Sequence, residues 1–229
     1  MKSSADQEKQ NAANAAFEHL EGLLADNGEK RVTLGIGTGS TVQHFINKLP
    51  SLMTKINHLV SSSKQSTDAM KALELPVTDL NQVSLIDYYV DGADECDPHL
   101  NLIKGGGGAL TQEKILASNS NVFIGIADHT KLVQSLGKFP LPIEVIPMAR
   151  SAVARKIATL GGNPVYRSNF ITDNHNVILD VYGLNLSQPL ALEHELKHIP
   201  GVVETGIFAH RRADHFFIAK KDSVDFLSA

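Results

Sequence analysis

Short apolar runs alternate with segments of helical periodicity over the first 138 residues. Four runs have the length and apolar content of buried strands, at residues 31–37, 56–63, 84–90 and 121–128. Apolar residues three or four positions apart predict helices between them, at residues 41–49, 66–74 and 109–118. Ser66 or Thr67 is the expected cap of the second of these helices. The alternation predicts an α/β fold with an open, mostly parallel, Rossmann-like sheet and helices on both faces.

The rhythm changes after Pro140 and Pro142, which mark a domain boundary. Strands are predicted at residues 143–147, 163–167, 176–183 and 202–208, and helices at residues 149–160 and 188–198. The order β-α-β-β-α-β is typical of a small ferredoxin-like α+β domain. The tail, residues 213–227, is expected to return to the first domain as strand. We therefore predict a Rossmann-like catalytic domain and a small α+β domain, at residues 1–138 with 209–229 and at residues 139–208.

Composition and charge argue against a nucleic-acid-binding protein and against a membrane protein. The 229 residues carry 21 Lys and Arg against 25 Asp and Glu, and this net charge of −4 argues against a nucleic-acid partner. Hydrophobic residues make up 42% of the chain, as in ordinary globular proteins. The N-terminal segment is polar, and no apolar stretch has the length of a membrane span, so no membrane partner is expected. The single cysteine, Cys96, cannot form an internal disulfide, which favours a cytoplasmic location.

A glycine-rich turn, Gly37-Thr38-Gly39-Ser40-Thr41, joins the first predicted strand to the helix after it. Glycines let backbone N–H groups converge, a helix N-terminus carries partial positive charge, and hydroxyl groups can donate hydrogen bonds. The turn therefore suits a phosphate group. It matches neither the Walker loop nor the G-x-G-x-x-G dinucleotide pattern, which argues against a nucleotide cofactor. The same residues could instead form only a tight turn capped by Ser40.

Two more unusual loops accompany this turn. The acidic segment DGADE, with Asp91 and Asp94, ends the third strand, where open α/β sheets place their ligands. Lys104 leads into four glycines, and Glu113 lies early in the next helix. A lysine beside such a loop can stabilise an oxyanion, and an ionised carboxylate can act as a general base. These residues could instead have purely structural roles. The aspartates would then belong to a polar turn, and Glu113 would interact favourably with the helix dipole.

One motif points to a different chemistry. Residues 194–198, HELKH, match the H-E-x-x-H pattern of zinc hydrolases. Helical geometry places Leu192, Leu196 and Ile199 on one apolar face, so the two histidines should face solvent on the other side. We therefore expect no metal site in this helix. Cys96 has no evident partner base, and we interpret it as a neighbour of the acidic loop rather than a nucleophile.

Five segments, taken in order and spacing, resemble those of the ribose-5-phosphate isomerase type A family. They are GIGTGST, SSSKQST, YVDGADE, IKGGGGALTQEKI and GKFPLPIEVIPMARSAVARK. The resemblance covers about residues 9–229 and is strongest between residues 35 and 155. It implies an aldose–ketose isomerase of the non-oxidative pentose phosphate pathway. Such an enzyme interconverts D-ribose 5-phosphate and D-ribulose 5-phosphate through an enediolate, with no metal or organic cofactor.

The resemblance also implies roles for individual residues. Glu113 corresponds to the general base that moves a proton between C1 and C2, and Asp91, Asp94 and Lys104 correspond to the other catalytic groups. Ring opening suits Asp91, with Asp94 orienting Lys104 or moving protons between O1 and O2, although the sequence leaves the choice of aspartate open. An N-terminal phosphate-contacting lysine would correspond to Lys9. The implied substrate contacts are Thr38, Gly39, Ser40, Thr41, Asp91, Gly92, Ala93, Asp94, Lys104, Gly105, Gly106, Gly107 and Lys131.

Two other functions fit part of the pattern. A non-catalytic domain that senses sugar phosphates would keep the phosphate-binding turn, but it would not need the acid, base and lysine set. An acyl-CoA transferase could use Glu113 as a nucleophile, but it would form a covalent thioester and have a longer chain. The resemblance further implies a homo-oligomer, either a homodimer or a tetramer, that takes a phosphorylated pentose as its substrate.

Overall fold

The computed structural model describes residues 4–26, 28 and 30–229. The chain forms two compact units. Unit 1 contains Met1–Gly92, Ile115–Lys131 and Ala213–Ala229, and unit 2 contains Ala93–Lys114 and Leu132–Arg212. The functional domains expected at residues 1–138 with 209–229 and at 139–208 stay a prediction.

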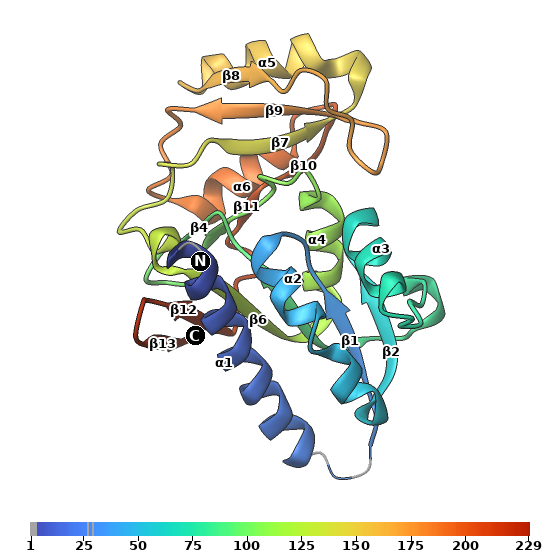
Figure 1. Cartoon of the computed structure of the whole chain (residues 1–229). Helices are drawn as coiled ribbons and strands as arrows, with labels where there is room; N and C mark the ends of the chain where they lie inside the picture. Colours follow the sequence, from blue (N-terminus) through green and yellow to red (C-terminus); the bar gives the residue numbers. More distant parts are fainter. Residues whose placement is uncertain (1–3, 27, 29) are drawn as a thin grey trace. The chain divides into compact units, whose positions relative to one another are not determined.

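Unit 1 is built on a six-stranded sheet (Figure 1). Its strands, in the order β13-β12-β6-β3-β1-β2, are β1 (Val32–Ile36), β2 (Ile56–Ser61), β3 (Ile86–Gly92), β6 (Ser120–Asp128), β12 (His215–Ala219) and β13 (Val224–Ser228). All neighbouring pairs are parallel except β12 with β13. This confirms the predicted open, mostly parallel sheet. The C-terminal tail returns to the sheet as predicted, because β12 pairs with β6.

Helices flank this sheet. They are α1 (Ser4–Asp26), α2 (Ser40–Ile46), α3 (Lys64–Ala72) and α4 (Leu110–Ser118), with short 3-10 turns η1 (Leu49–Lys55), η2 (Leu80–Gln82) and η3 (His129–Lys131). The helix predicted at residues 41–49 ends earlier, and η1 follows it with Pro50 in its first turn. The expected cap of α3 was wrong. Ser63 caps this helix by accepting a hydrogen bond from the N–H of Ser66 at 3.1 Å.

The core of unit 1 follows from the spacing of small and apolar residues on α1. Its buried positions recur every three or four residues, at Ala13, Ala16, Phe17, Leu20 and Leu24. These side chains pack in one cluster with apolar residues of β1, β6 and α2. Full burial of a Leu or Phe side chain contributes about 1.5–3 kcal/mol, so this face fixes α1 on the sheet.

Unit 2 contains a four-stranded antiparallel sheet in the order β10-β7-β9-β8. Figure 1 shows β7, β9 and β8 side by side. The elements follow one another as β7 (Leu141–Val145), η4 (Pro147–Ala149), α5 (Arg150–Thr159), β8 (Asn163–Tyr166), β9 (Val177–Tyr182), α6 (Pro189–Lys197) and β10 (Val202–Thr205). This order confirms the predicted β-α-β-β-α-β arrangement.

A second sheet in unit 2 has no counterpart in the sequence prediction. It has the order β11-β5-β4 and consists of β4 (Glu95–Cys96), β5 (Leu102–Ile103) and β11 (Ile207–Phe208). Strands of two residues are too short to show a periodicity. The strand predicted at residues 202–208 is divided at Gly206, where an added Cβ would lie 2.3 Å from the carbonyl oxygen of Lys104. This close approach lets the N–H of Lys104 donate to the carbonyl of Gly206 at 2.9 Å.

Among residues 4–26, 28 and 30–229, no helix is both long enough and apolar enough to cross a membrane.

Candidate functional site

The strand order of unit 1 places two of the predicted loops together. The strand order changes direction at β1, because the next strand in the sequence, β2, lies on one side of β1 and the following strand, β3, lies on the other. Open α/β sheets bind ligands beyond the carboxyl ends of the strands at such a point. β1 ends at Ile36 and β3 at Gly92. The loop at residues 37–41, here called the β1–α2 loop, therefore meets Asp91 at this edge.

Asp91 holds the β1–α2 loop in place. Its carboxylate accepts hydrogen bonds from the N–H groups of Thr38 at 2.9 Å and Gly92 at 2.7 Å, and the Tyr89 hydroxyl donates to its other oxygen. Asp91 is fully buried, so these donors offset its loss of water contacts. A Cβ on Gly37 would lie 2.0 Å from this carboxylate, which is why the loop begins with glycine.

The rest of the loop exposes groups suited to an anion. Gly39 is the N-cap of α2 with φ of 113°, a backbone conformation that favours glycine, and it provides no side-chain cap for the first N–H groups. The Thr38 and Ser62 hydroxyl oxygens lie 3.0 Å apart. Ser40 is exposed and Thr41 is half-buried. Backbone N–H groups and hydroxyls in this arrangement can bind a phosphate.

Two lysines belong to the same unit as this loop. The Lys9 ammonium group on α1 donates to the Ser40 hydroxyl at 3.0 Å. Lys131 is half-buried and ends η3, directly after β6. The sequence indicated Lys9 only through the family resemblance, because its contact with Ser40 joins positions 31 residues apart. The structure thus adds a cation beside the β1–α2 loop.

The second group of site residues lies in unit 2 and centres on a buried ion pair. The Lys104 ammonium nitrogen lies 3.2 Å from Oε2 of Glu113, and the two side chains are 3% and 5% exposed. Glu113 belongs to the first turn of α4, and Lys104 follows β5. The Lys104 ammonium also lies 5.5 Å from the centre of the Phe208 ring. Burying two charges is costly, so such a pair marks a candidate functional site.

The glycine loop, residues 105–108, is held beside Lys104 by Asp94. Its carboxylate accepts a hydrogen bond from the N–H of Gly106 at 2.7 Å. A Cβ on Gly106 would lie 2.6 Å from the same carboxylate, so glycine is required here. Gly105 and Gly108 have φ of 102° and 82°, values that favour glycine. The loop thus presents its backbone with little side-chain bulk, and Gly107 is exposed.

Residues that the sequence analysis missed support the glycine loop from the other side. The Arg167 guanidinium group donates to the carbonyl of Gly106 at 3.1 Å and pairs with Asp180 at 2.5 Å. The Phe170 ring packs so closely on Gly108 that an added Cβ would lie 2.1 Å from it. Both residues lie in or beside the segment between β8 and β9, more than 50 positions from the loop. No local sequence pattern could have indicated them.

A network of charges holds the start of α4, residues 110–114, within unit 2. The Lys114 ammonium group lies 2.6 Å from Glu193 and 3.1 Å from Glu204, and it donates to the carbonyl of Ile207 at 2.6 Å. The Lys114 ammonium group also lies 4.8 Å from the centre of the Phe208 ring. This ring therefore packs against both Lys104 and Lys114. Because Lys114 follows Glu113 directly, this network fixes the part of the helix that carries the candidate base.

Glu204 makes the stability of this network depend on pH. Burial alone would raise the pKa of Glu204, but Lys114 and Lys197, together with the Thr205 N–H group, hold it below its ordinary value of 4.5. A carboxyl group with a lowered pKa stabilises the fold above pH 4.5, and this contribution is lost as the pH falls through the lowered pKa. We expect Glu204→Gln to lower the Tm at pH 7 by about 2–4 °C, as for a loss of about 1 kcal/mol.

Thermal unfolding at a series of pH values measures this effect. The difference in Tm between the wild type and Glu204→Gln should shrink as the pH falls below 4.5. Glu195→Gln, at an exposed position of the neighbouring helix α6, is the matched control and should change the Tm little. A difference that stays constant across the series would contradict the assignment.

The predicted site residues thus fall into two sets, each placed within its own unit. Unit 1 contains Thr38, Gly39, Ser40, Thr41, Asp91, Gly92 and Lys131, and unit 2 contains Ala93, Asp94, Lys104, Gly105, Gly106, Gly107 and Glu113. Within unit 1, the β1–α2 loop meets Asp91, and within unit 2, Asp94 and Glu113 flank the glycine loop and Lys104.

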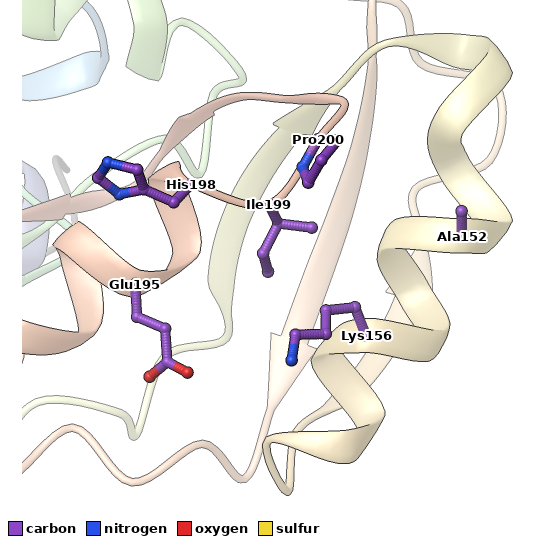
Figure 2. A pocket seen from close by; sticks show the side chains of 6 residues that line it. All are labelled: Ala152, Lys156, Glu195, His198, Ile199 and Pro200. Atoms are coloured by element: carbon purple, nitrogen blue, oxygen red, sulfur yellow. The ribbon is translucent and has the colours of Figure 1, made fainter.

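The other sequence motifs lie apart from these sets of contacts. His194 of α6 and His198, which follows the helix as its C-cap, are exposed as predicted, and Nδ1 of His198 donates to the carbonyl of His194 at 2.6 Å. Glu195, His198 and Lys156 are among the residues that line a hollow of about 500 Å³. Figure 2 shows Glu195 and His198 at the end of α6 on one side and Lys156 of α5 on the other. The hollow contains none of the predicted site residues. Burial, followed by the nearby Asp97, raises the pKa of the Cys96 thiol to about 12, which makes it a poor nucleophile.

Comparison with known proteins gives one consistent result. The family model for ribose 5-phosphate isomerase A (phosphoriboisomerase A) matches residues 58–223. The ribose 5-phosphate isomerase A of Neisseria gonorrhoeae is 43% identical, with a TM-score of 0.91 over 98% of this chain and 97% of that one. The enzyme of Methanocaldococcus jannaschii is 36% identical, with a TM-score of 0.88 over 97% of this chain and 99% of that one.

A third structure, a D-ribose-5-phosphate isomerase in complex with phospho-erythronic acid, is 37% identical, with a TM-score of 0.89 over the full length of both chains. The family model covers well over half of the sequence, and each of these structures matches nearly all of it. The segment that matches the family model contains Asp91, Lys104 and Glu113 and begins after the β1–α2 loop. The chain therefore belongs to the ribose 5-phosphate isomerase A family.

Proposed function

We propose that this protein interconverts D-ribose 5-phosphate and D-ribulose 5-phosphate by proton transfer through an enediolate. The observation that carries the proposal is the buried pair of Lys104 and Glu113. An aldose–ketose isomerisation needs a base that removes a weakly acidic proton next to a carbonyl group, and it needs a positive charge near the oxygen that becomes negative. The pair provides both groups on neighbouring elements.

The proposed reaction assigns a step to each of these groups. Glu113 removes the proton from C2 of the open-chain aldose, and the electron pair moves to form the enediolate with negative charge on O1. The Lys104 ammonium group stabilises this charge. Glu113 then returns the proton to C1, while O1 and O2 exchange a proton, so that C2 becomes the carbonyl carbon. The reaction consumes no water and changes only the positions of hydrogen atoms.

We assign the remaining steps to the two aspartates. Asp94 accepts a hydrogen bond from the N–H group of Gly106, which supports a role in orienting the glycine loop, and we also assign to it the proton transfer between O1 and O2. Ring opening requires a group that transfers a proton between the anomeric hydroxyl and the ring oxygen, and we assign it to Asp91. Backbone N–H groups and the Tyr89 hydroxyl hold the Asp91 carboxylate in one orientation, which supports this role.

We assign the phosphate group of the substrate to the β1–α2 loop, Lys9 and Lys131. Binding energy from a remote phosphate can fix the sugar against the base and so accelerate the reaction at C1 and C2. We infer that both sets of residues act on one substrate molecule. Membership of the ribose 5-phosphate isomerase A family supports this inference, because the family resemblance assigns residues of both sets to one sugar phosphate.

A coupled assay that follows ribulose 5-phosphate formation tests the proposed function. The wild-type chain should convert ribose 5-phosphate efficiently and should convert ribose, which lacks the phosphate, far more slowly. A protein that binds ribose 5-phosphate without turning it over would be a sensing domain instead. The buried Lys104–Glu113 pair favours the enzyme, because a binding domain gains nothing from a base placed beside an ammonium group.

Loss of the two hydroxyl groups in the β1–α2 loop should weaken phosphate binding. We expect the Ser40→Ala, Thr41→Ala double variant to raise the KM for ribose 5-phosphate at least about tenfold, because hydrogen bonds to charged groups contribute about 1.5–3 kcal/mol each. The kcat should stay within a few-fold of the wild type. Inhibition by inorganic phosphate should weaken by a similar factor.

Ser51→Ala, at an exposed serine of η1, is the control for this prediction and should leave both constants unchanged. If the double variant kept its KM, or if ribose became as good a substrate as ribose 5-phosphate, the assignment of the phosphate site would be wrong.

We further propose a cytoplasmic homo-oligomer, a dimer or a tetramer. Its support is a group of large apolar side chains that unit 2 exposes, of which Met148 is 96% exposed. The others are Leu132, Ile146, Val165, Tyr166, Ile171, Tyr182 and Leu190. Exposed apolar side chains of this kind are typical of subunit interfaces. The mass of the native protein in solution measures the number of subunits.

A further inference from the structure

A buried carboxylate on α1 lies outside the machinery described so far. Glu8 pairs with His129 of η3, and Oε2 of Glu8 lies 2.5 Å from Nδ1 of the imidazole. The two side chains are 5% and 52% exposed, so the acidic partner lies inside the fold and the imidazole at its surface. Because an ionised carboxylate only accepts hydrogen bonds, Nδ1 is the donor in this contact.

A second buried carboxylate, that of Asp128, holds the turn that carries His129. Asp128, the last residue of β6, accepts hydrogen bonds from the N–H group of Thr130 at 3.0 Å and from its hydroxyl. These bonds hold the turn η3, which begins at His129. One ligand atom from each of Glu8, Asp128 and His129 lies within 4.8 Å of the others. Protein donors already account for this grouping, so it does not require a metal ion.

Packing does not explain why position 8 is acidic. The buried positions that follow on α1, such as Ala12, Ala13 and Ala16, are apolar and pack in the core of unit 1. An apolar residue at position 8 would continue this face, whereas a buried carboxylate must recover the cost of its lost hydration through its partner. The acidic residue at position 8 therefore serves its contact with His129 rather than the packing of the core.

The neighbours of Glu8 and His129 in the sequence suggest what this contact does. Glu8 directly precedes Lys9, whose ammonium group donates to Ser40, and His129 lies two residues before Lys131. The contact thus joins the two segments that carry the two lysines. A further pair, Asp6 with His44 at 2.9 Å, joins the same end of α1 to α2.

We propose that Glu8 is a positioning residue, which acts through His129 to hold Lys9 and Lys131 where they bind the phosphate group of the substrate. This inference rests on the proposed function, because it assumes that the two lysines bind that phosphate. Glu8 itself does not touch the substrate. Its effect is therefore expected on substrate and phosphate affinity, and not on the chemical steps at C1 and C2.

The test compares Glu8→Leu, which removes the acceptor, with Glu8→Gln, which keeps an oxygen in the same place. Glu8→Leu should raise the KM for ribose 5-phosphate and the inhibition constant of inorganic phosphate about fivefold or more, with kcat within twofold of the wild type. Glu8→Gln should restore both constants to within about twofold. Glu21→Gln, at an exposed position of the same helix, is the matched control and should have no effect.

The exposed partner gives a second pair of variants, which keeps the test valid if Glu8→Leu does not fold. His129→Leu removes the donor, and His129→Asn keeps an N–H group close to the position of Nδ1. The first should reproduce the effect of Glu8→Leu and the second should restore affinity. In a Lys9→Ala background, Glu8→Leu should raise the KM by a much smaller factor, because the residue acts through that lysine.

The outcomes separate this inference from the proposed function. Unchanged affinity in Glu8→Leu and His129→Leu, in an enzyme where Lys9→Ala weakens phosphate binding, would overturn the positioning role alone. A fall in kcat at constant KM, or full additivity with Lys9→Ala, would also overturn it. If Lys9→Ala and Lys131→Ala together left KM and phosphate inhibition unchanged, the proposed phosphate site would fail and this inference with it.

Discussion

Replacement of Glu113 by glutamine should lower kcat at least about 100-fold, with a small change in the KM for ribose 5-phosphate. Glutamine keeps the size and shape of the side chain but cannot accept the proton from C2, and general base catalysis contributes about 10²–10⁴ in rate. An interaction made only during the chemical step affects kcat and kcat/KM equally. Steady-state kinetics in the coupled assay measures both constants.

Two controls make the Glu113→Gln result interpretable. Because Lys104 pairs with Glu113, the variant must keep a cooperative thermal unfolding transition. Exchange of the substrate hydrogen at C2 with deuterium from the solvent should slow as much as isomerisation does, because both need the same base. Glu195→Gln, an exposed glutamate of unit 2, should leave kcat unchanged. Activity of Glu113→Gln within a few-fold of the wild type would refute the assignment of the base.

The second large effect is expected at Lys104. Lys104→Met keeps most of the apolar side chain against Phe208 and removes the ammonium group. The negative charge of the enediolate then loses its partner, and the loss of one such group costs about 10²–10³ in kcat. The same change leaves the buried Glu113 carboxylate without its cation, so we also expect a lower Tm.

Stability and catalysis can be separated in this variant. Lys156→Met, at an exposed lysine of α5, is the control and should change neither the Tm nor kcat. Assays well below the Tm of Lys104→Met report the catalytic loss alone. Addition of a small alkylammonium ion to Lys104→Ala should restore part of the activity, since the ion can replace the missing charge. A folded Lys104→Met variant with kcat within tenfold of the wild type would contradict the proposed role of Lys104.

The sequence predicted the elements of the fold because most of them carry a strong periodic signal. The five parallel strands and the β-α-β-β-α-β order both appear as apolar runs separated by helical spacing. The cap of α3 was misplaced because three serines precede the helix, and only the backbone geometry shows that Ser63 is extended and accepts the bond from Ser66. The strands β4, β5 and β11 are two residues long and leave no periodic pattern.

The candidate site was predictable in its residue types and not in its contacts. Glycines and an acidic segment at the ends of buried strands indicated the β1–α2 loop and Asp91. The run of four glycines between a lysine and the start of a helix indicated Lys104 and Glu113, and the family resemblance assigned the roles of these residues. The pairing of Lys104 with Glu113 depends on the path of the glycine loop between them, which periodicity does not describe. Lys9 reaches Ser40 across 31 positions, and Arg167 reaches the glycine loop across about 60, so neither contact has a local signal.

A crystal structure of Glu113→Gln with ribose 5-phosphate bound tests most directly whether the two sets of residues serve one substrate. Our account predicts the phosphate group on Ser40, Thr41 and Lys9, and C1 and C2 of the same sugar beside residue 113 and Lys104. A sugar phosphate that contacts only one of the two sets, or that binds away from the β1–α2 loop, would contradict it.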